Sequence, residues 1–187
     1  MGYNHFIISG LLSGVLYLLY HKVNDTAILS KVLKWLLIFN FVSFNATLLL
    51  SGAFDYKTHL PIHLCYLTEL GIFLSIIFKS NILYPWLALN ALGGGITGFT
   101  NSNLSENALL IEYIHLYLSH FSLILFFIII YLNKFTISRY AFIQSTIFNA
   151  LLFFAVCYFN ILVESNYWFT MHRPPGSNLA QLLPDWP

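Results

Sequence analysis

The residue types best suited to chemistry gather in the segment Leu60-Pro61-Ile62-His63-Leu64-Cys65. Proline suits the first turn of a helix, because the N–H that it lacks would have no partner there. A helix that begins at Pro61 would place Cys65 in its first turns, where free N–H groups and the helix dipole favour a thiolate. Cys65 is therefore a candidate nucleophile. The alternative is a small apolar residue in a helix-packing seam, an interpretation that fits Cys157 better.

A thiol nucleophile needs a base, and His120 is the best candidate because it lies near the middle of an apolar segment. An ionisable group at such a depth usually faces the interior of a helix bundle or a wet cavity. Tyr113 and Tyr117 lie seven and three residues before His120 and share its helix face. The alternative is a neutral histidine that hydrogen-bonds to a neighbouring helix.

Other polar residues near Cys65 are predicted to support this pair. Glu69 follows Cys65 by one turn on the same face, where it could orient His120 or form a structural pair with a tyrosine. His63 lies about 200° round the helix from Cys65, so the two cannot both point straight into one pocket. We therefore expect His63 to bind a lipid headgroup, to support the site or to cap another helix.

A metal site built from Cys65, His63, His120 and His172 is the weaker interpretation. The sequence contains no HExxH motif and no paired cysteine spacing. GxSxG, P-loop and dinucleotide-binding motifs are also absent from it. We expect neither a metal nor another cofactor.

The elements that position these residues follow from composition. Charged residues make up 8% of the 187 residues, whereas a soluble domain has about 25%, so most of the surface must face lipid. The net charge of +1 gives no basic patch for nucleic acid. We predict an all-α, polytopic transmembrane bundle that forms one domain over residues 1–187. Six apolar runs approach the length of a membrane span: Phe6–Tyr20, Val32–Ala53, Leu60–Phe78, Ile82–Thr100, Leu109–Leu132 and Tyr140–Val163.

Basic residues predict the orientation in the membrane. Six of them follow or flank the first, third and fifth runs, namely Lys22, Lys31, Lys34, Lys79, Lys134 and Arg139, and two lie on the other side, Lys57 and Arg173. We therefore expect the N-terminus and the tail after Val163 to be extracytoplasmic. The glycines of the fourth run, Gly93, Gly94, Gly95 and Gly98, favour close helix packing over a functional break.

Five stretches match a known pattern in order and at similar spacing: Leu60–Cys65 (LPIHLC), Leu92–Gly95 (LGGG), Ser119-His120, Asn166-Tyr167 followed by Arg173-Pro174, and Leu183–Pro187 (LPDWP). On these stretches the chain resembles the YwaF-like integral membrane proteins of bacteria, whose animal relative is transmembrane protein 164. Thr97 and Asn101-Ser102-Asn103 depart from the pattern, because relatives carry a glutamine and a Thr-Pro-Asp turn there.

The resemblance implies a seven-helix fold, the plasma membrane of a bacterium and acyl transfer. The animal relative is described as a phospholipid acyltransferase with a cysteine nucleophile and a histidine, and these roles map onto Cys65 and His120. Relatives continue into a seventh helix beyond the position of Pro187, so we expect this chain to be a fragment, a truncated reading frame or a reduced member of the family.

The resulting prediction is a lipid acyltransferase of the membrane with a Cys65/His120 dyad, which binds membrane lipids. Helix N-terminal amides, or Asn90 and Thr97, would hold the oxyanion, and Arg173 would bind phosphate with Asn166 and Tyr167. The predicted substrate-binding residues are His63, Glu69, Asn90, Thr97, Tyr117, Asn166, Tyr167 and Arg173. The alternatives are a lipid hydrolase with the same site, a small transporter or substrate-binding membrane subunit, and a purely structural membrane protein.

Overall fold

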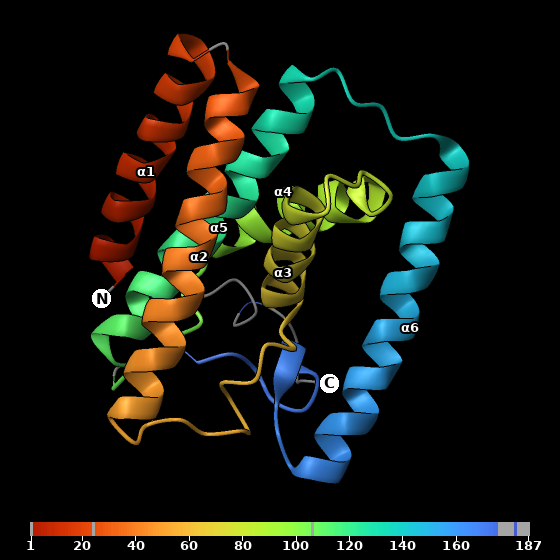
Figure 1. Cartoon of the computed structure of the whole chain (residues 1–187). Coiled ribbons are helices and arrows are strands. Elements are labelled where there is room, and N and C mark those ends of the chain that lie inside the picture. Colours follow the sequence, from red (N-terminus) through yellow and green to blue (C-terminus); the bar gives the residue numbers. More distant parts are fainter. Residues whose placement is uncertain (1, 24, 106, 176–181, 183–187) are drawn as a thin grey trace.

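The computed structural model of the chain describes residues 2–23, 25–105, 107–175 and 182. These residues form six α-helices and one short 3₁₀-helix (Figure 1), and none of them lies in a β-strand. The predicted all-α bundle is therefore confirmed. The elements are α1 (Gly2–Lys22), α2 (Thr26–Leu50), α3 (Leu64–Ile77), α4 (Tyr84–Thr100), α5 (Leu110–Leu132), α6 (Arg139–Val163) and η1 (Tyr167–Phe169).

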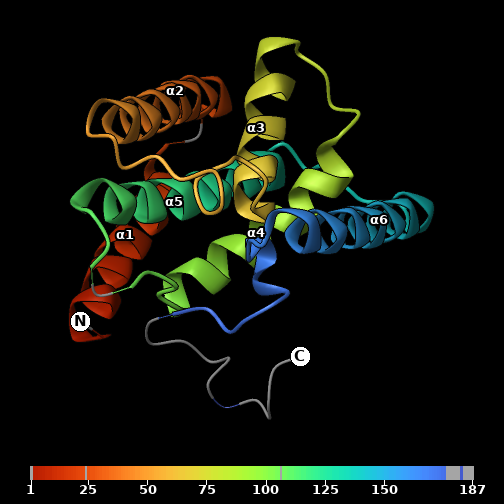
Figure 2. The same ribbon diagram turned by 90° about the horizontal axis from the view of Figure 1, so that it is seen from below.

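Helix α5 is the centre of the bundle. Figure 2 shows it between α2 on one side and α1 with α4 on the other, and it packs against all of these helices. Its inward side chains, among them Leu123, Leu125 and Phe126, join Leu87 of α4 and Leu37 of α2 in one apolar core. Burial of this apolar face, more than intrinsic helix propensity, is what stabilises helices of this length.

Three helices, α2, α5 and α6, are long and apolar enough to cross a membrane. They differ in burial: 56% of the most apolar window of α5 is buried in the protein, but only 11% of that of α6. Helix α6 stands apart from the bundle (Figure 1) and contacts mainly α4 and η1. Its exposed apolar side chains, such as Leu151, Phe154 and Leu162, suit a lipid environment, and the three helices together fit an integral membrane protein.

The start of α3 differs from the sequence prediction. The helix begins at Leu64, with His63 in an extended conformation (ψ 142°) as its N-cap, so Pro61 lies in the preceding loop rather than in the first turn. The reason is that Ile62 O accepts a hydrogen bond from Trp168 Nε1 at 2.7 Å and Leu60 N–H donates to Tyr167 Oη at 2.8 Å. Contacts with the tail thus take up backbone groups of this loop, and Cys65 is the second residue of α3.

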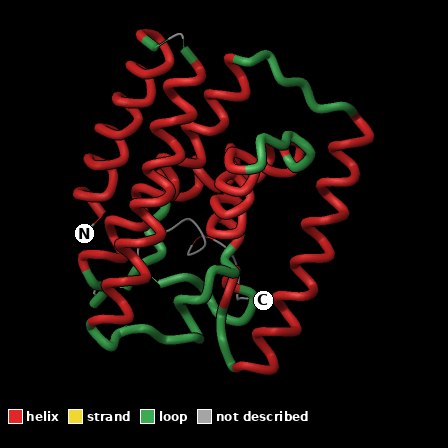
Figure 3. The backbone as a smooth tube through the Cα atoms, in the orientation of Figure 1, coloured by secondary structure: helices red, strands yellow, loops and turns green. Residues whose placement is uncertain are grey.

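Connections lie at both ends of the bundle, and the α3–α4 connection lies between the two ends (Figure 3). Thr26 Oγ1 donates to Asn133 Oδ1 at 3.0 Å, which joins the α1–α2 and α5–α6 connections at one end. At the other end, the loop between α2 and α3 meets the segment after α6 through Tyr167. The predicted orientation of the chain in the membrane stays a prediction.

The segment Ser165–Phe169, which we call the tail hook, is fixed by Asn160 and Tyr167. Asn160 Nδ2 donates to Tyr167 O at 2.7 Å, and Tyr167 N–H donates back to Asn160 Oδ1 at 2.9 Å. Trp168 and Phe169 have positive φ angles of 58° and 53°, a conformation that costs bulky residues energy. Packing of the hook against the α2–α3 loop must offset that cost.

Replacing Tyr167 by phenylalanine is expected to destabilise the protein by about 1–3 kcal/mol. The Tyr167 hydroxyl donates to Tyr56 O at 2.7 Å and accepts from Leu60 N–H at 2.8 Å, and phenylalanine leaves both backbone groups unpaired. Thermal unfolding of detergent-solubilised protein measures the change. Tyr158→Phe is the matched control, because Tyr158 is exposed on α6; equal melting temperatures for the two variants would contradict the role of the hook.

Candidate functional site

A cavity of about 1210 Å³ opens between the N-terminal end of α3, helices α4 and α5, and the tail hook. Its wall contains five residues predicted from the sequence, namely Cys65, His120, His63, Asn90 and Thr97. The tail contributes Trp168, Phe169, Pro174 and Pro175. The volume exceeds that of a typical small-molecule site. Apolar side chains also make up much of the wall, so the cavity suits a lipid segment better than a small polar metabolite.

Two glycines of α4 bring Cys65 and His120 to the same helix face. A Cβ atom added at Gly94 would lie 3.2 Å from Cys65 Sγ, and one added at Gly98 would overlap the imidazole ring of His120. Gly94 and Gly98 are one turn apart, so the thiol and the imidazole lie over neighbouring turns, about 5–6 Å apart along the α4 axis. The predicted close packing at these glycines is what the structure shows.

The thiol of Cys65 and the imidazole of His120 share one cavity wall. No hydrogen bond joins Cys65 to His120 in the described part of the chain. Catalytic contacts are often loose in the absence of substrate and tighten when it binds. The geometry itself shows a thiol and an imidazole on one cavity wall, without a direct hydrogen bond.

The hydrogen bonds of His120 fix which of its nitrogens can act as a base. Nδ1 lies 2.7 Å from Leu116 O, and since a carbonyl only accepts, Nδ1 carries the proton of the neutral ring. Nε2 is left as an acceptor at the cavity wall. The group that orients the ring is therefore the backbone carbonyl of Leu116 in the same helix, and not Glu69.

Glu69 belongs to a buried network behind the cavity wall. Its carboxylate accepts from Ser119 Oγ at 2.8 Å and from Asn40 Nδ2 at 3.2 Å. Asn40 and Glu69 are both fully buried, and Asn40 Oδ1 lies 3.1 Å from His115 Nδ1. Of the two roles predicted for Glu69, the structure supports the structural one. Its partners are a serine and an asparagine rather than a tyrosine. Glu69 does not line the cavity.

Tyr117 points to another part of the bundle. Its hydroxyl lies 3.0 Å from His5 Nδ1, and the two rings stack with centroids 5.4 Å apart. His5 belongs to α1, and neither residue lines the cavity. The predicted polar stripe on α5 is therefore divided: Tyr117 joins α5 to α1, while His120 faces α4.

Asn90 and Thr97 line the cavity, but their donor groups are already bonded. Asn90 exchanges hydrogen bonds with Asn149 of α6 at 2.9 and 3.2 Å, and also donates to Trp86 O. Thr97 Oγ1 donates to Gly93 O at 2.8 Å. Asn90 therefore joins α4 to α6, whereas the hydroxyl of Thr97 bonds within α4. With these donors engaged, the structure does not support the prediction that the two residues hold an oxyanion.

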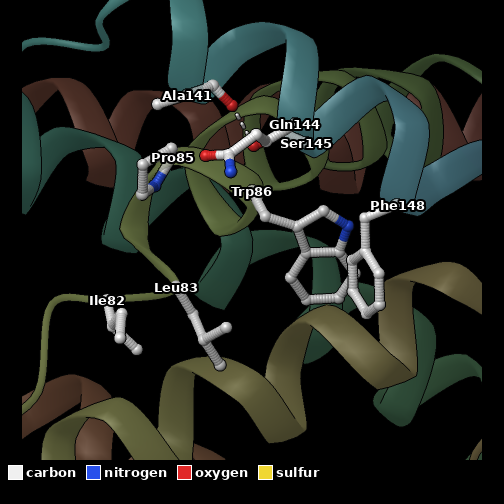
Figure 4. Close-up of a pocket in the computed structure, with 8 residues that line it drawn as sticks. All are labelled: Ile82, Leu83, Pro85, Trp86, Ala141, Gln144, Ser145 and Phe148. Atoms are coloured by element: carbon white, nitrogen blue, oxygen red, sulfur yellow. Dashed lines mark hydrogen bonds between the residues drawn. The ribbon is translucent and has the colours of Figure 1, made fainter.

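A second, smaller pocket of about 160 Å³ lies where α6 packs against α4. Figure 4 shows Trp86 and Phe148 side by side in it, with ring centroids 5.4 Å apart, and Ser145 hydrogen-bonded to Ala141 within α6. The indole N–H of Trp86 donates to Asn149 Oδ1 at 2.6 Å. This pocket is part of the α4–α6 packing, and none of the predicted site residues lines it.

The N-terminus of α3 offers donors that remain free. His63 makes no side-chain capping bond, and the amide with an acceptor at this end is Leu67 N–H, bonded to His63 O at 2.9 Å. No other described residue accepts a hydrogen bond from the amides of Leu64, Cys65 and Tyr66, which line the cavity, and the Cys65 N–H approaches its own thiol. They are the donors best placed for an oxyanion next to the thiol.

His63, in the loop before α3, is a neutral donor at the same place. Burial lowers the pKa of His63 to about 4, so the ring is uncharged at pH 7. Nδ1 accepts a hydrogen bond from Trp168 N–H at 3.4 Å, which leaves the proton on Nε2. Both rings line the cavity. His63 carries an N–H donor on Nε2, whereas Nε2 of His120 is an acceptor.

The lowered pKa of His63 predicts that acid destabilises the fold. The unfolded chain takes up a proton near pH 6.5 and the folded chain only near pH 4, so the free energy of unfolding falls as the pH drops through this interval. Thermal unfolding in detergent between pH 7.5 and 4 measures this loss. A His63→Gln variant lacks this contribution and is expected to lose less; parallel curves for the two proteins would contradict the assignment.

The remaining predicted residues lie in the tail. Asn166 uses its amide within the tail, where Oδ1 accepts from Met171 N–H and His172 N–H and Nδ2 donates to His172 O. Tyr167 is fully buried in the contacts of the tail hook. Arg173 directly precedes the two prolines of the cavity wall, and the final stretch Leu183–Pro187 lies outside the described residues.

The described residues include no group of three or more His, Cys, Asp and Glu side chains that could hold a metal ion.

A comparison with protein-family models matches the TMEM164 family over residues 1–187. The chain belongs to the TMEM164 family. The match confirms the predicted relationship to transmembrane protein 164. Comparisons with curated proteins and with solved structures found no significant match.

Membership of the TMEM164 family is consistent with a membrane protein, as the three apolar helices are. The sequence predictions assigned no role in the site to two polar residues at the cavity, His115 on the wall and Asn40 behind it. Both lie inside apolar runs. The rule that singled out His120, that polar groups at such depth face the bundle interior, applies to them equally.

Proposed function

We propose that this protein is a membrane lipid acyltransferase that uses Cys65 as nucleophile and His120 as base. The observation that carries the proposal is the cavity wall on which both residues lie, over adjacent turns of the glycine face of α4. In the first half-reaction, Cys65 Sγ attacks the ester carbonyl of a phospholipid and its proton moves to His120 Nε2. The carbon–oxygen bond breaks, and the leaving lysolipid oxygen takes that proton.

In the second half-reaction, the hydroxyl of another lysolipid attacks the thioester carbonyl. Its proton passes to His120 Nε2 and then to the departing sulfur, which restores the thiol and the neutral imidazole. The two half-reactions are a ping-pong sequence with a covalent acyl-enzyme. Water as acceptor would make the same site a hydrolase.

The negative charge on the carbonyl oxygen would be held by the free amides at the start of α3 and by the Nε2–H of His63. A neutral histidine donor does not have to give up a charge to the oxyanion, and burial keeps His63 neutral at pH 7. Arg173, beside the prolines of the cavity wall, is the candidate for the lipid phosphate because guanidinium binds phosphate in a bidentate manner.

The test is acyl exchange by the purified protein in mixed micelles. A diacyl phosphatidylcholine with one isotope-labelled chain serves as donor and an unlabelled lysophosphatidylcholine as acceptor, and mass spectrometry follows the label. We expect labelled diacyl product to form without external acyl-coenzyme A. Label that appears only as free fatty acid would indicate the hydrolase, and label that stays in the donor would contradict both.

A further inference from the structure

A second oriented imidazole, that of His115, lines the same cavity and has no part in the reaction just described. Nδ1 of His115 lies 3.1 Å from Asn40 Oδ1. The Asn40 amide nitrogen in turn donates to Glu69 Oε1 at 3.2 Å and to Ser119 Oγ at 3.1 Å. These bonds fix the direction of the Asn40 amide, so its oxygen faces His115 and the proton of the neutral imidazole must sit on Nδ1.

The ring of His115 is also held in its plane. It stacks on Phe44 with centroids 3.9 Å apart and an interplanar angle of 12°, and Tyr66 flanks it at 5.0 Å. Nε2 lies on the edge opposite the Asn40 bond. It has no hydrogen-bond partner among the described residues, and it is not among their buried, unsatisfied atoms. A fixed acceptor nitrogen is therefore open to the cavity.

His115 is poorly placed to act on the thiol. It precedes His120 by five residues on α5, which corresponds to about 7.5 Å along the axis and about 140° around it. His120 meets α4 at Gly98, whereas the contacts of His115 are with Phe44 of α2 and Tyr66 of α3. The two imidazoles thus present two separate acceptor positions in one cavity.

The chemistry of Nε2 defines what His115 can bind. As an acceptor, it pairs with an O–H or N–H group of a ligand. Ester carbonyls and phosphodiester oxygens are themselves acceptors, so a diacyl phosphatidylcholine offers it no donor. A lysophosphatidylcholine has one donor, the free glycerol hydroxyl. Close by, His59 Nε2 and Glu112 Oε1 lie 3.7 Å apart on the wall, which makes this a polar part of the cavity.

We propose that His115, fixed by Asn40, is the positioning residue that binds the free hydroxyl of the acyl acceptor, a lysolipid. This inference rests on the proposed acyl transfer and deepens it. It assigns one part of the cavity to the acceptor, apart from the Cys65–His120 pair that handles the donor ester. In the bound lysolipid, His115 accepts the hydrogen bond of this hydroxyl and takes up no proton. For the attack on the thioester, the hydroxyl turns its single proton to His120 Nε2, which removes it as the carbon–oxygen bond forms.

The test separates acceptor binding from thioester formation. His115→Phe keeps the ring on Phe44 but removes both nitrogens, and His115→Gln restores an acceptor oxygen. We expect His115→Phe to raise the KM for lysophosphatidylcholine about tenfold, while the rate of Cys65 acylation by diacyl phosphatidylcholine alone stays within about twofold. His115→Gln should recover part of the loss, and His21→Phe, at the exposed end of α1, should match the wild type.

An unchanged KM for the acceptor, or an equal slowing of Cys65 acylation, would overturn the assignment. The second comparison does not depend on the reaction. In Cys65→Ala protein, the additional substitution His115→Phe should weaken the binding of lysophosphatidylcholine about tenfold. If wild-type Cys65 is never acylated, the proposed function fails, and this binding comparison still decides on His115. Equal binding by the two proteins would contradict the subsite.

Discussion

Replacement of Cys65 by serine is expected to lower acyl exchange by roughly 10³-fold or more. A serine hydroxyl at this place would need a much stronger base than a thiol does, and His120 lies over the next turn of α4 without a hydrogen bond to the nucleophile. The fold should survive, because the side chain is only half-buried at the cavity wall. The measurement is label transfer from diacyl phosphatidylcholine to lysophosphatidylcholine.

Cys157→Ser is the matched control for this experiment. Cys157 lies on α6, is also half-buried and does not line the cavity. Its replacement should leave the rate unchanged. Full turnover by Cys65→Ser, or a comparable loss in Cys157→Ser, would contradict the assigned nucleophile.

Replacement of Gly98 by alanine is expected to inactivate and destabilise the protein together. Alanine favours a helix over glycine by up to about 1 kcal/mol, but its Cβ would overlap the imidazole of His120. The ring can move only by giving up its bond to Leu116 O, or α4 must shift away from α5. We expect a net loss of about 1–3 kcal/mol and a fall in acyl exchange of about 10²-fold, because the base is displaced.

Gly93→Ala provides the control in the same helix. Apart from its chain neighbours and the nearby backbone of α4, no atom lies within 4 Å of a Cβ at that position, so alanine there should raise the melting temperature slightly. Gly93 also lines the cavity, and its added methyl group should lower acyl exchange far less than the one at Gly98. Thermal unfolding and acyl exchange are measured on both variants. Equal behaviour of Gly98→Ala and Gly93→Ala would show that close approach of α4 to His120 is not needed.

The helices could be predicted because long apolar runs separated by polar loops specify membrane helices almost without tertiary information. The observed bounds of α4 and α5 differ from the predicted ones by two residues or fewer at each end. The start of α3 could not be predicted, because the bond between Trp168 Nε1 and Ile62 O depends on a segment about 100 residues further along the chain.

Those residues of the candidate site that carry a signal in their local sequence could be predicted. Cys65 at a helix start and His120 inside an apolar run are signals of this kind, and both line the cavity. Asn90 and Tyr117 have partners on other helices, Asn149 and His5. Sequence spacing within one helix cannot show such partners, and these partners engage the side chains that were predicted to bind substrate.

The central claim is that Cys65 carries the acyl chain between two lipids. It is tested most directly by incubating the protein with diacyl phosphatidylcholine alone, quenching at low pH and measuring the mass of the peptide that contains Cys65. The account predicts one acyl group on Cys65, released by neutral hydroxylamine and discharged when lysophosphatidylcholine is added. Acyl exchange that proceeds with an unmodified Cys65, or in a protein that lacks its thiol, would contradict it.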